Sequence, residues 1–373
     1  MTNTIGTAVP DSSQTRPRAE FAADSAVKPR NLDALTGLRF FAALSVAVYH
    51  VPYVLPSAVG ATLLPSGGLG VSFFFILSGF ILTHVYRGRS FDTGEFYRRR
   101  FARIYPLHFL TAVVWIALFF QGWGNPFQEK INSAVANFLL VQAFFSGPLF
   151  NLGLNAVSWS ISVEALFYVI FPFVRRGFTP LLFLAVCLVE DIGLPREWYS
   201  NIEAAFPSFF YFNPFGRLLE FGFGMACYMV YVRIQASYLI AAVAQVAGPV
   251  LLVTLVSASA AMPEHYRNAL LIFPFGATIV AFALDGPMSR VIGTKPFIVL
   301  GESSFAFYMI HHMLFRYIDV PLASLRLPPI FAGLLAFALI TAVAIAVHYG
   351  FERPARSLLN RTPTVTSPSR RQP

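Results

Sequence analysis

The sequence predicts an all-α membrane protein, a polytopic bundle of about ten transmembrane helices with both termini in the cytoplasm. Of the 373 residues, 56% are hydrophobic and only 12% are charged, and the mean hydropathy is +0.62. Soluble domains carry about 25% charged residues, so the composition indicates an integral membrane protein. Apolar windows of about 20 residues fit membrane helices, whereas the strands of a membrane barrel would alternate over about 10 residues.

Ten apolar windows predict the ten helices in order along the chain. They cover residues 33–54, 68–86, 102–121, 156–174, 178–194, 211–232, 237–259, 267–285, 297–315 and 328–350. In the second window, small residues such as Gly70 and Gly79 would permit close helix approach. The stretch 133–145 is apolar but short, and Gln142 interrupts it, so we predict an interfacial segment there instead of a span.

The distribution of basic residues predicts the topology. With the N-terminus inside, 20 of the 27 Lys and Arg residues lie in cytoplasmic tails and loops, five lie outside and two lie within spans. Cytoplasmic loops of membrane proteins are rich in Lys and Arg, so this bias favours an even number of spans. We predict disordered cytoplasmic tails at 1–31 and 359–373, and one membrane domain at 32–358.

The net charge and the two cysteines do not point to nucleic acid, disulfide bonds or a metal. The formal net charge of +9 would suggest nucleic acid for a soluble protein, but here the topology accounts for it. We therefore expect no nucleic-acid partner. Cys187 and Cys227 both lie in apolar windows, so the sequence predicts neither a disulfide framework nor a metal site.

The first window carries Arg39 and, eleven residues later, His50. Eleven residues at ~100° each make three turns plus ~20°, so both side chains point the same way, roughly 16 Å apart along the helix axis. Such groups are costly in a membrane unless they face a cavity, which marks a candidate functional site. The alternative is that Arg39 only anchors the helix and His50 only lies at the interface.

An arginine cluster follows the second window, with four arginines between positions 98 and 103. Arg100 and Arg103 are one helical turn apart, so their guanidinium groups can converge on one phosphate cluster. The alternative explanation combines the topological bias with binding of anionic lipid headgroups.

Glu164 lies in the fourth window, about one and a half turns inside the outer membrane surface. A carboxylate at this depth must be paired, protonated or in contact with water. Beside His50 it would orient the imidazole and stabilise its charged form, and Ser160 would share its helix face. The alternative is a structural ion pair, for example with Arg217.

Two further groups lie in later windows. Arg217 and Glu220 are three residues apart, so we expect them to neutralise each other. Ser304, Tyr308 and His311 form one stripe along the ninth window. His312 follows directly, and two consecutive helical residues cannot both face the bundle core, so we do not predict a metal pair there.

Together these residues resemble the acyltransferase-3 family of membrane O-acyltransferases, which modify bacterial surface polysaccharides and some secondary metabolites. The resemblance covers about residues 33–356. It rests on six motifs in order, which are LTGLR at 35–39 with His50 beyond it, GVSFFFILSGFIL at 70–82, RFARIYP at 100–106, WSISVE at 159–164, the stripe at 304–311, and FERP at 351–354. One departure is Ala165, where the family often has a second acidic residue.

The resemblance implies an enzyme of the bacterial inner (plasma) membrane. It would transfer a short acyl group, with acetyl the first expectation, from cytoplasmic acyl-CoA to a hydroxyl of a surface glycan, such as an exopolysaccharide, or its lipid-linked precursor. Acetyl-CoA or a related acyl-CoA would be the co-substrate, with no permanently bound cofactor and no metal. The other expected contacts are membrane lipids, and formation of a homo-oligomer is left open.

The resemblance also suggests roles for the residues. His50 would be the essential general base, assisted by Glu164, while Arg39, Arg100 and Arg103 would bind the donor. An acyl-histidine route is left open. We expect substrate or oxyanion contacts from the remaining site residues, Trp159, Ser160, Tyr308 and His311. This scheme requires a water-lined passage between the arginines and His50.

A transporter or flippase for an anionic or sugar-linked substrate is the alternative function. Its buried Arg, Glu and His side chains would relay protons or bind the substrate. The sequence shows no repeated halves and no paired broken helices, which disfavours this class. The arginine cluster is also predicted at the membrane surface, within reach of a soluble anionic donor.

Overall fold

In the computed structural model, every regular element of the described residues is a helix, which confirms the predicted all-α class. The structure describes residues 32–50, 68–122, 124–177, 179–193, 201–202, 209–259, 262 and 264–361. The predicted N-terminal tail, the end of the first predicted span at 51–54, and residues 362–373 lie outside these ranges. The last described helix runs to Asn360, two residues beyond the predicted domain end at 358.

Each of the ten predicted windows contains a helix. In order these helices are α1 (Asp33–Tyr49), α3 (Gly70–Tyr86), α4 (Thr93–Phe119), α7 (Trp159–Val174), α8 (Thr179–Gly193), α11 (Leu218–Tyr231), α12 (Tyr238–Ala258), α13 (Glu264–Ala283), α15 with α16 (Lys295–Glu302 and Ser304–Ser324), and α17 (Pro329–Val347). The ninth window is therefore two helices, bent by 58° where they join.

Shorter elements connect these helices. They are α5 (Phe127–Phe138), the 3-10 turn η3 (Gln142–Phe144), α6 (Pro148–Asn151), α10 (Phe209–Phe212), η4 (Phe215–Arg217), α14 (Pro287–Ile292), the π turn η5 (His348–Glu352) and α18 (Arg353–Asn360). The predicted interfacial segment at 133–145 thus consists of the end of α5 and η3, and neither is long enough to be a span.

Three helices in the described part of the chain are long and apolar enough to cross a membrane, and the bent pair of α15 and α16 would make a fourth. The three are Thr93–Phe119, Tyr238–Ala258 and the continuous helix Pro329–Asn360. Three shorter apolar helices are Gly70–Tyr86, Trp159–Val174 and Ala269–Ala283. The prediction of ten spans with both ends in the cytoplasm stays a prediction.

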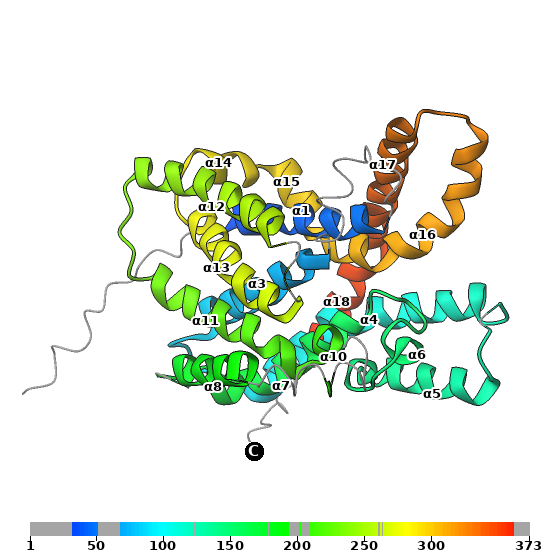
Figure 1. Ribbon diagram of the computed structural model, residues 1–373, viewed down its shortest axis with the longest axis horizontal. Coiled ribbons are helices and arrows are strands. Elements are labelled where there is room, and N and C mark those ends of the chain that lie inside the picture. Colours follow the sequence, from blue (N-terminus) through cyan, green and yellow to red (C-terminus); the bar gives the residue numbers. More distant parts are fainter. Residues whose placement is uncertain are drawn as a thin grey trace, which may run out of the picture. The chain divides into compact units, whose positions relative to one another are not determined.

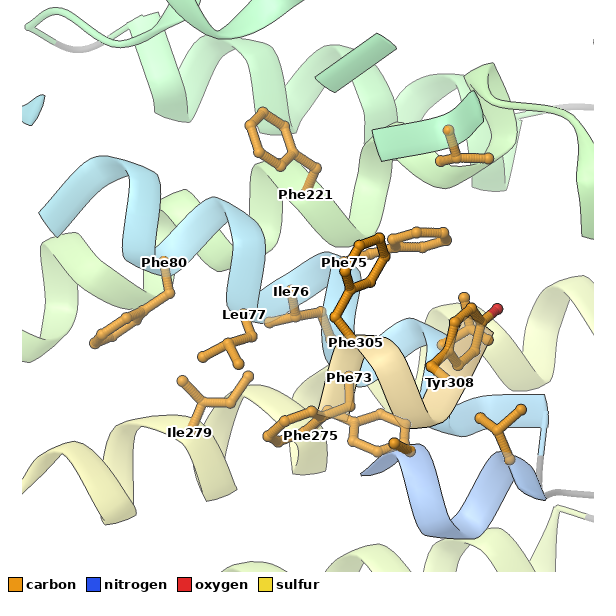
Figure 2. Packing of buried hydrophobic residues seen from close by; sticks show 14 of the residues in the cluster. Phe73, Phe75, Ile76, Leu77, Phe80, Phe221, Phe275, Ile279, Phe305 and Tyr308 are labelled. Atoms are coloured by element: carbon orange, nitrogen blue, oxygen red, sulfur yellow. The ribbon is translucent and has the colours of Figure 1, made fainter. Parts of the chain in front are cut away.

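The largest group of buried side chains surrounds α3. Its sequence is apolar on all sides, which is the pattern of a helix enclosed by others. Figure 2 shows Ile76 and Leu77 of α3 between Phe221 of α11 and Ile279 of α13. Phe75 extends this packing toward α7, where its ring meets Phe167 edge to face at 5.1 Å between centroids.

Two glycines bring α3 and α11 into backbone contact. A Cβ atom at Gly79 would lie 2.1 Å from the carbonyl oxygen of Phe221, and one at Gly224 would lie 1.9 Å from that of Ile76. Both positions therefore require glycine at this helix separation, as in other membrane helix pairs with small residues at the contact. The predicted close approach is confirmed at Gly79.

A buried polar network fixes the start of α7. The Asn137 amide donates to the Ser158 hydroxyl oxygen at 3.0 Å, and the Gln142 amide donates to the Ser158 carbonyl at 3.0 Å. The ring Nε2 of His108 on α4 bonds the carbonyl of Asn137 at 2.9 Å. Because these bonds join α4, α5 and η3 to Ser158, they set the direction in which Trp159 and Ser160 leave the helix start.

Candidate active site

Two cavities lie along α1. The first, which we call the arginine cavity, has a volume of about 330 Å³, and its polar lining includes Thr36, Arg39, Ser78, Arg100, Arg103, Ser160, Glu164, Tyr168, Ser304 and Arg356. The second, which we call the histidine cavity, has a volume of about 410 Å³, and its lining includes Tyr49, His50, Trp159, Tyr211, Phe212, Arg267, Tyr308 and His312. Helix α1 thus contributes Arg39 to one cavity and His50 to the other.

The arginine cavity carries an excess of positive charge. Four arginines and one carboxylate, Glu164, line its described wall, which leaves an excess of three positive charges. Among the described residues, no carboxylate lies within 4.0 Å of any of these four guanidinium groups. The Arg100 guanidinium instead lies 5.7 Å from the centre of the Tyr168 ring. Aromatic faces stabilise a cation only partly, so this cavity suits an anionic ligand.

Glu164 lies with the arginines. It lines the arginine cavity, where it accepts a hydrogen bond from the Tyr168 hydroxyl, and its charge acts on Arg39. His50 lines the other cavity, so the structure does not bring together the pair that the sequence suggested. The reason is the facing of α7, which turns Glu164 toward α4 and Ser162 toward the carbonyl of Leu140.

His311 takes the position beside His50 that was expected for Glu164. The Nδ1 atom of His50 lies 2.9 Å from the carbonyl oxygen of Val46 and 3.3 Å from Nε2 of His311. Nδ1 of His311 lies 2.7 Å from the carbonyl oxygen of Tyr308. His311 is fully buried, so its ring is held in this orientation.

These contacts indicate the tautomers of both rings. A carbonyl oxygen can only accept, so Nδ1 must carry the proton in both His50 and His311. Nε2 of His311 is then an acceptor facing the Nδ1 proton of His50. We infer that Nε2 of His50 keeps its lone pair, which is the form that a general base needs.

His312 also lies beside His50, although the sequence argument expected only one of the two consecutive histidines to face inward. The centre of the His50 ring is 5.2 Å from the His311 ring and 5.2 Å from the His312 ring. Consecutive helical side chains diverge by ~100°, and His50 lies between them at the end of α1. Both rings therefore reach it from one helix.

Tyr308 lies at the border of the two cavities. Among the described lining residues, the cavities share Tyr308 and Val71. The Tyr308 hydroxyl donates to the carbonyl of Val157 at 3.0 Å and lies 2.8 Å from the Ser160 hydroxyl. Both contacts hold the Tyr308 side chain at this border between the arginines and His50.

Arg217 and Glu220 form the ion pair that their spacing predicts. The Nη1 atom of Arg217 lies 2.9 Å from Oε1 of Glu220, and both side chains are less than 5% exposed. The Arg217 Nε–H also donates to the carbonyl of Tyr211 at 2.8 Å, and its guanidinium lies 5.7 Å from the centre of the Trp159 ring. This pair supports two aromatic residues of the histidine cavity.

Tyr168 and Arg356 are two of the arginine-cavity residues that were not among the predicted site residues. Tyr168 follows Glu164 by one helical turn, and this spacing could have identified it. Arg356 lies on α18 after the π turn, where an extra residue changes the helical register. Periodicity alone could not have placed Arg356 in the cavity.

Comparison with known proteins places this site in a family. The family model described as "Acyltransferase domain" matches residues 32–349. The acyltransferase MdmB of Streptomyces mycarofaciens is 32% identical over an alignment of 381 positions. The alignment covers 90% of this chain and 95% of that protein. No solved structure matches the chain.

Two O-acetyltransferase relatives are less similar to this chain. The peptidoglycan O-acetyltransferase OatA of Listeria monocytogenes is 24% identical over 87% of this chain and 55% of its own length. The O-acetyltransferase OatA of Staphylococcus aureus is 24% identical over 88% of this chain and 58% of its own length. The chain therefore spans slightly more than half the length of these two relatives.

Proposed function

The chain belongs to the acyltransferase domain family and is an O-acyltransferase, and on this premise we propose that it transfers a short acyl group, acetyl above all, from acyl-CoA to a hydroxyl of a glycan or its lipid-linked precursor. The names of the O-acetyltransferase relatives support the acyl group, and that of the peptidoglycan relative supports the acceptor class. The enzyme would act in the bacterial inner membrane.

The arginine cavity is the proposed donor site. Its excess of three positive charges matches the phosphate groups of coenzyme A, because guanidinium groups bind phosphates through charge-assisted, bidentate hydrogen bonds. The cavity also has an apolar lining, including Phe74, Leu77 and Ile81, along which the pantetheine arm would lie. Its thioester end would then point toward Tyr308.

His50 is the proposed general base. Its Nε2 would take the proton from the acceptor hydroxyl while that oxygen attacks the thioester carbonyl carbon. When the carbon–sulfur bond breaks, the protonated His50 would return the proton to the thiolate, which leaves free CoA and the new ester. His311 would keep Nδ1 of His50 protonated throughout, so that only Nε2 exchanges protons.

The junction between the cavities would stabilise the developing negative charge. The Ser160 hydroxyl lies there, 2.8 Å from that of Tyr308, and a small rotation would direct it at the oxyanion. The acyl group must pass Tyr308 to reach His50, so the tyrosine ring must move during each transfer. One observation carries the whole proposal, namely that a cavity with an excess of three positive charges and a cavity with an oriented histidine share Tyr308 and Val71 in their linings.

The test uses the purified full-length protein in detergent with labelled acetyl-CoA. We expect CoA binding by the wild type, transfer of label to extracted lipid-linked precursors, and loss of transfer by about 10²–10⁴-fold in His50→Ala with CoA binding unchanged. His84→Ala is the matched control, because His84 lines neither cavity. Failure of the wild type to bind CoA, or more than a few per cent of activity in His50→Ala, would contradict the proposal.

A further inference from the structure

The helix that begins at Pro329 contains a π turn near its end. The turn covers His348–Glu352, and within it Nδ1 of His348 lies 2.9 Å from Oε2 of Glu352, with both side chains buried. A π turn holds one residue more than an α turn, so it rotates everything after it by about 100°. Turns of this kind are frequent at functional sites, and here the rotated element is α18.

The rotation turns α18 so that Arg356 reaches the arginine cavity. Helix α18 packs against α4, which carries Arg100 and Arg103, and the two helices lie close together in Figure 1. The Arg98 guanidinium donates to the carbonyl of Leu359 at 3.2 Å and fastens the end of α18 to α4. The side chain of Arg356 then lines the cavity and is half-buried.

Arg356 meets mainly like charge at this position. The charges of Arg103 and Arg100 act on it unfavourably, and that of Glu352 acts favourably. Glu352 is bound to His348 and does not line the cavity, so it leaves the cavity's positive excess in place. Clustered cations repel one another, and a bound anion with several charges would remove that repulsion.

We propose that Arg356 is a donor-binding residue for the phosphate groups of the acyl-CoA nucleotide, directed there by the π turn; this rests on the proposed function. An anionic lipid headgroup offers the same chemistry. The coenzyme is favoured because the cavity extends from the four arginines past buried apolar residues to Ser160 and Tyr308, at the edge of the histidine cavity. An anionic lipid headgroup would occupy only the part of the arginine cavity next to the arginines.

The test measures binding of CoA and of pantetheine, which lacks the nucleotide phosphates, by calorimetry on the full-length protein in neutral detergent. Arg356→Ala should raise the Kd for CoA about tenfold or more and leave that for pantetheine unchanged. The Kd of Arg356→Lys for CoA should lie between those of the wild type and Arg356→Ala, because lysine keeps the charge but cannot form bidentate hydrogen bonds. At saturating donor, kcat should change less than about twofold, since Arg356 does not touch the reacting atoms.

Arg353→Ala is the matched control, because Arg353 lies on the same helix and is exposed, with its guanidinium 5.7 Å from the centre of the Tyr349 ring. It should bind CoA like the wild type. Equal CoA affinity in Arg356→Ala and wild type would overturn the inference. A loss of pantetheine affinity as large as the loss of CoA affinity would also overturn it. So would a variant that binds CoA normally but loses affinity for phosphatidylglycerol in nanodiscs. If the wild type binds no CoA, the proposed function itself fails.

Discussion

The arginine cavity and the histidine cavity differ in how their polar groups are held. In the arginine cavity, no described carboxylate lies within 4.0 Å of the four guanidinium groups. In the histidine cavity, His50 contacts Val46 and His311, and Tyr308 contacts Val157 and Ser160. The arginines that would bind a charged substrate thus keep their charge for it. The groups of the histidine cavity are already oriented by contacts within the protein.

This difference follows from what each task requires. A binding site gains affinity when its charges have no protein partner to lose, although their mutual repulsion costs stability. A proton-transfer site gains rate when its base is already in the right tautomer and position, because no reorganisation is then needed in the transition state. Substitutions at three positions test whether the polar groups of the histidine cavity are held in this way.

The largest effect is expected from Glu220→Ala. Removal of this carboxylate breaks a buried ion pair, and breaking such a pair costs about 3–5 kcal/mol of stability. Thermal unfolding in detergent should show a marked fall in Tm, and the KM for the acceptor should rise more than that for the donor. An unchanged Tm would show that Arg217 is satisfied without Glu220.

A smaller effect is expected at His311. His311→Phe removes one of the two acceptors near the Nδ1 proton of His50 and leaves the Val46 carbonyl, so kcat should fall up to about tenfold through partial loss of orientation. His311→Gln supplies an amide oxygen and should recover part of that loss. The acidic limb of the pH profile of kcat/KM should also move in the Phe variant and return toward the wild type in the Gln variant. Equal activity in all three proteins would remove His311 from the mechanism.

The smallest effect is expected from Tyr308→Phe, which keeps the ring between the cavities but removes its hydroxyl. The lost contacts to Val157 and Ser160 should cost about 1 kcal/mol of stability. The ring should also move more readily, so hydrolysis of acyl-CoA without acceptor should rise a few-fold. Release of CoA thiol in a colorimetric assay measures this. A fall in hydrolysis would contradict the role of the hydroxyl as a restraint.

Local spacing predicted several of these features. The i, i+3 distance between Arg217 and Glu220 predicted their ion pair, and Gly79 predicted close helix contact. The hydrophobic windows predicted where helices occur. The ion pair and the windows depend on residues near one another along one helix, where helical geometry alone fixes their relation, and the contact at Gly79 depends on the small size of that residue.

Contacts between helices far apart in the sequence could not be predicted from spacing along the chain. The neighbours of Glu164 depend on how α7 is rotated against α4, and the position of Arg356 depends on one added residue in the π turn. The place of Tyr308 at the border of the two cavities depends on its side-chain direction, which hydrogen bonds to α7 and the preceding loop decide. No hydrophobic period encodes any of these three.

The tyrosine between the cavities has a consequence for inhibition. If donor and acceptor occupy separate compartments, a compound that fills one need not displace a compound in the other. Inhibitors directed at the two sides should therefore bind simultaneously and show mixed or noncompetitive patterns toward the opposite substrate. A bisubstrate analogue would have to hold Tyr308 open, so its gain over the separate halves would be reduced by the work of displacing that ring.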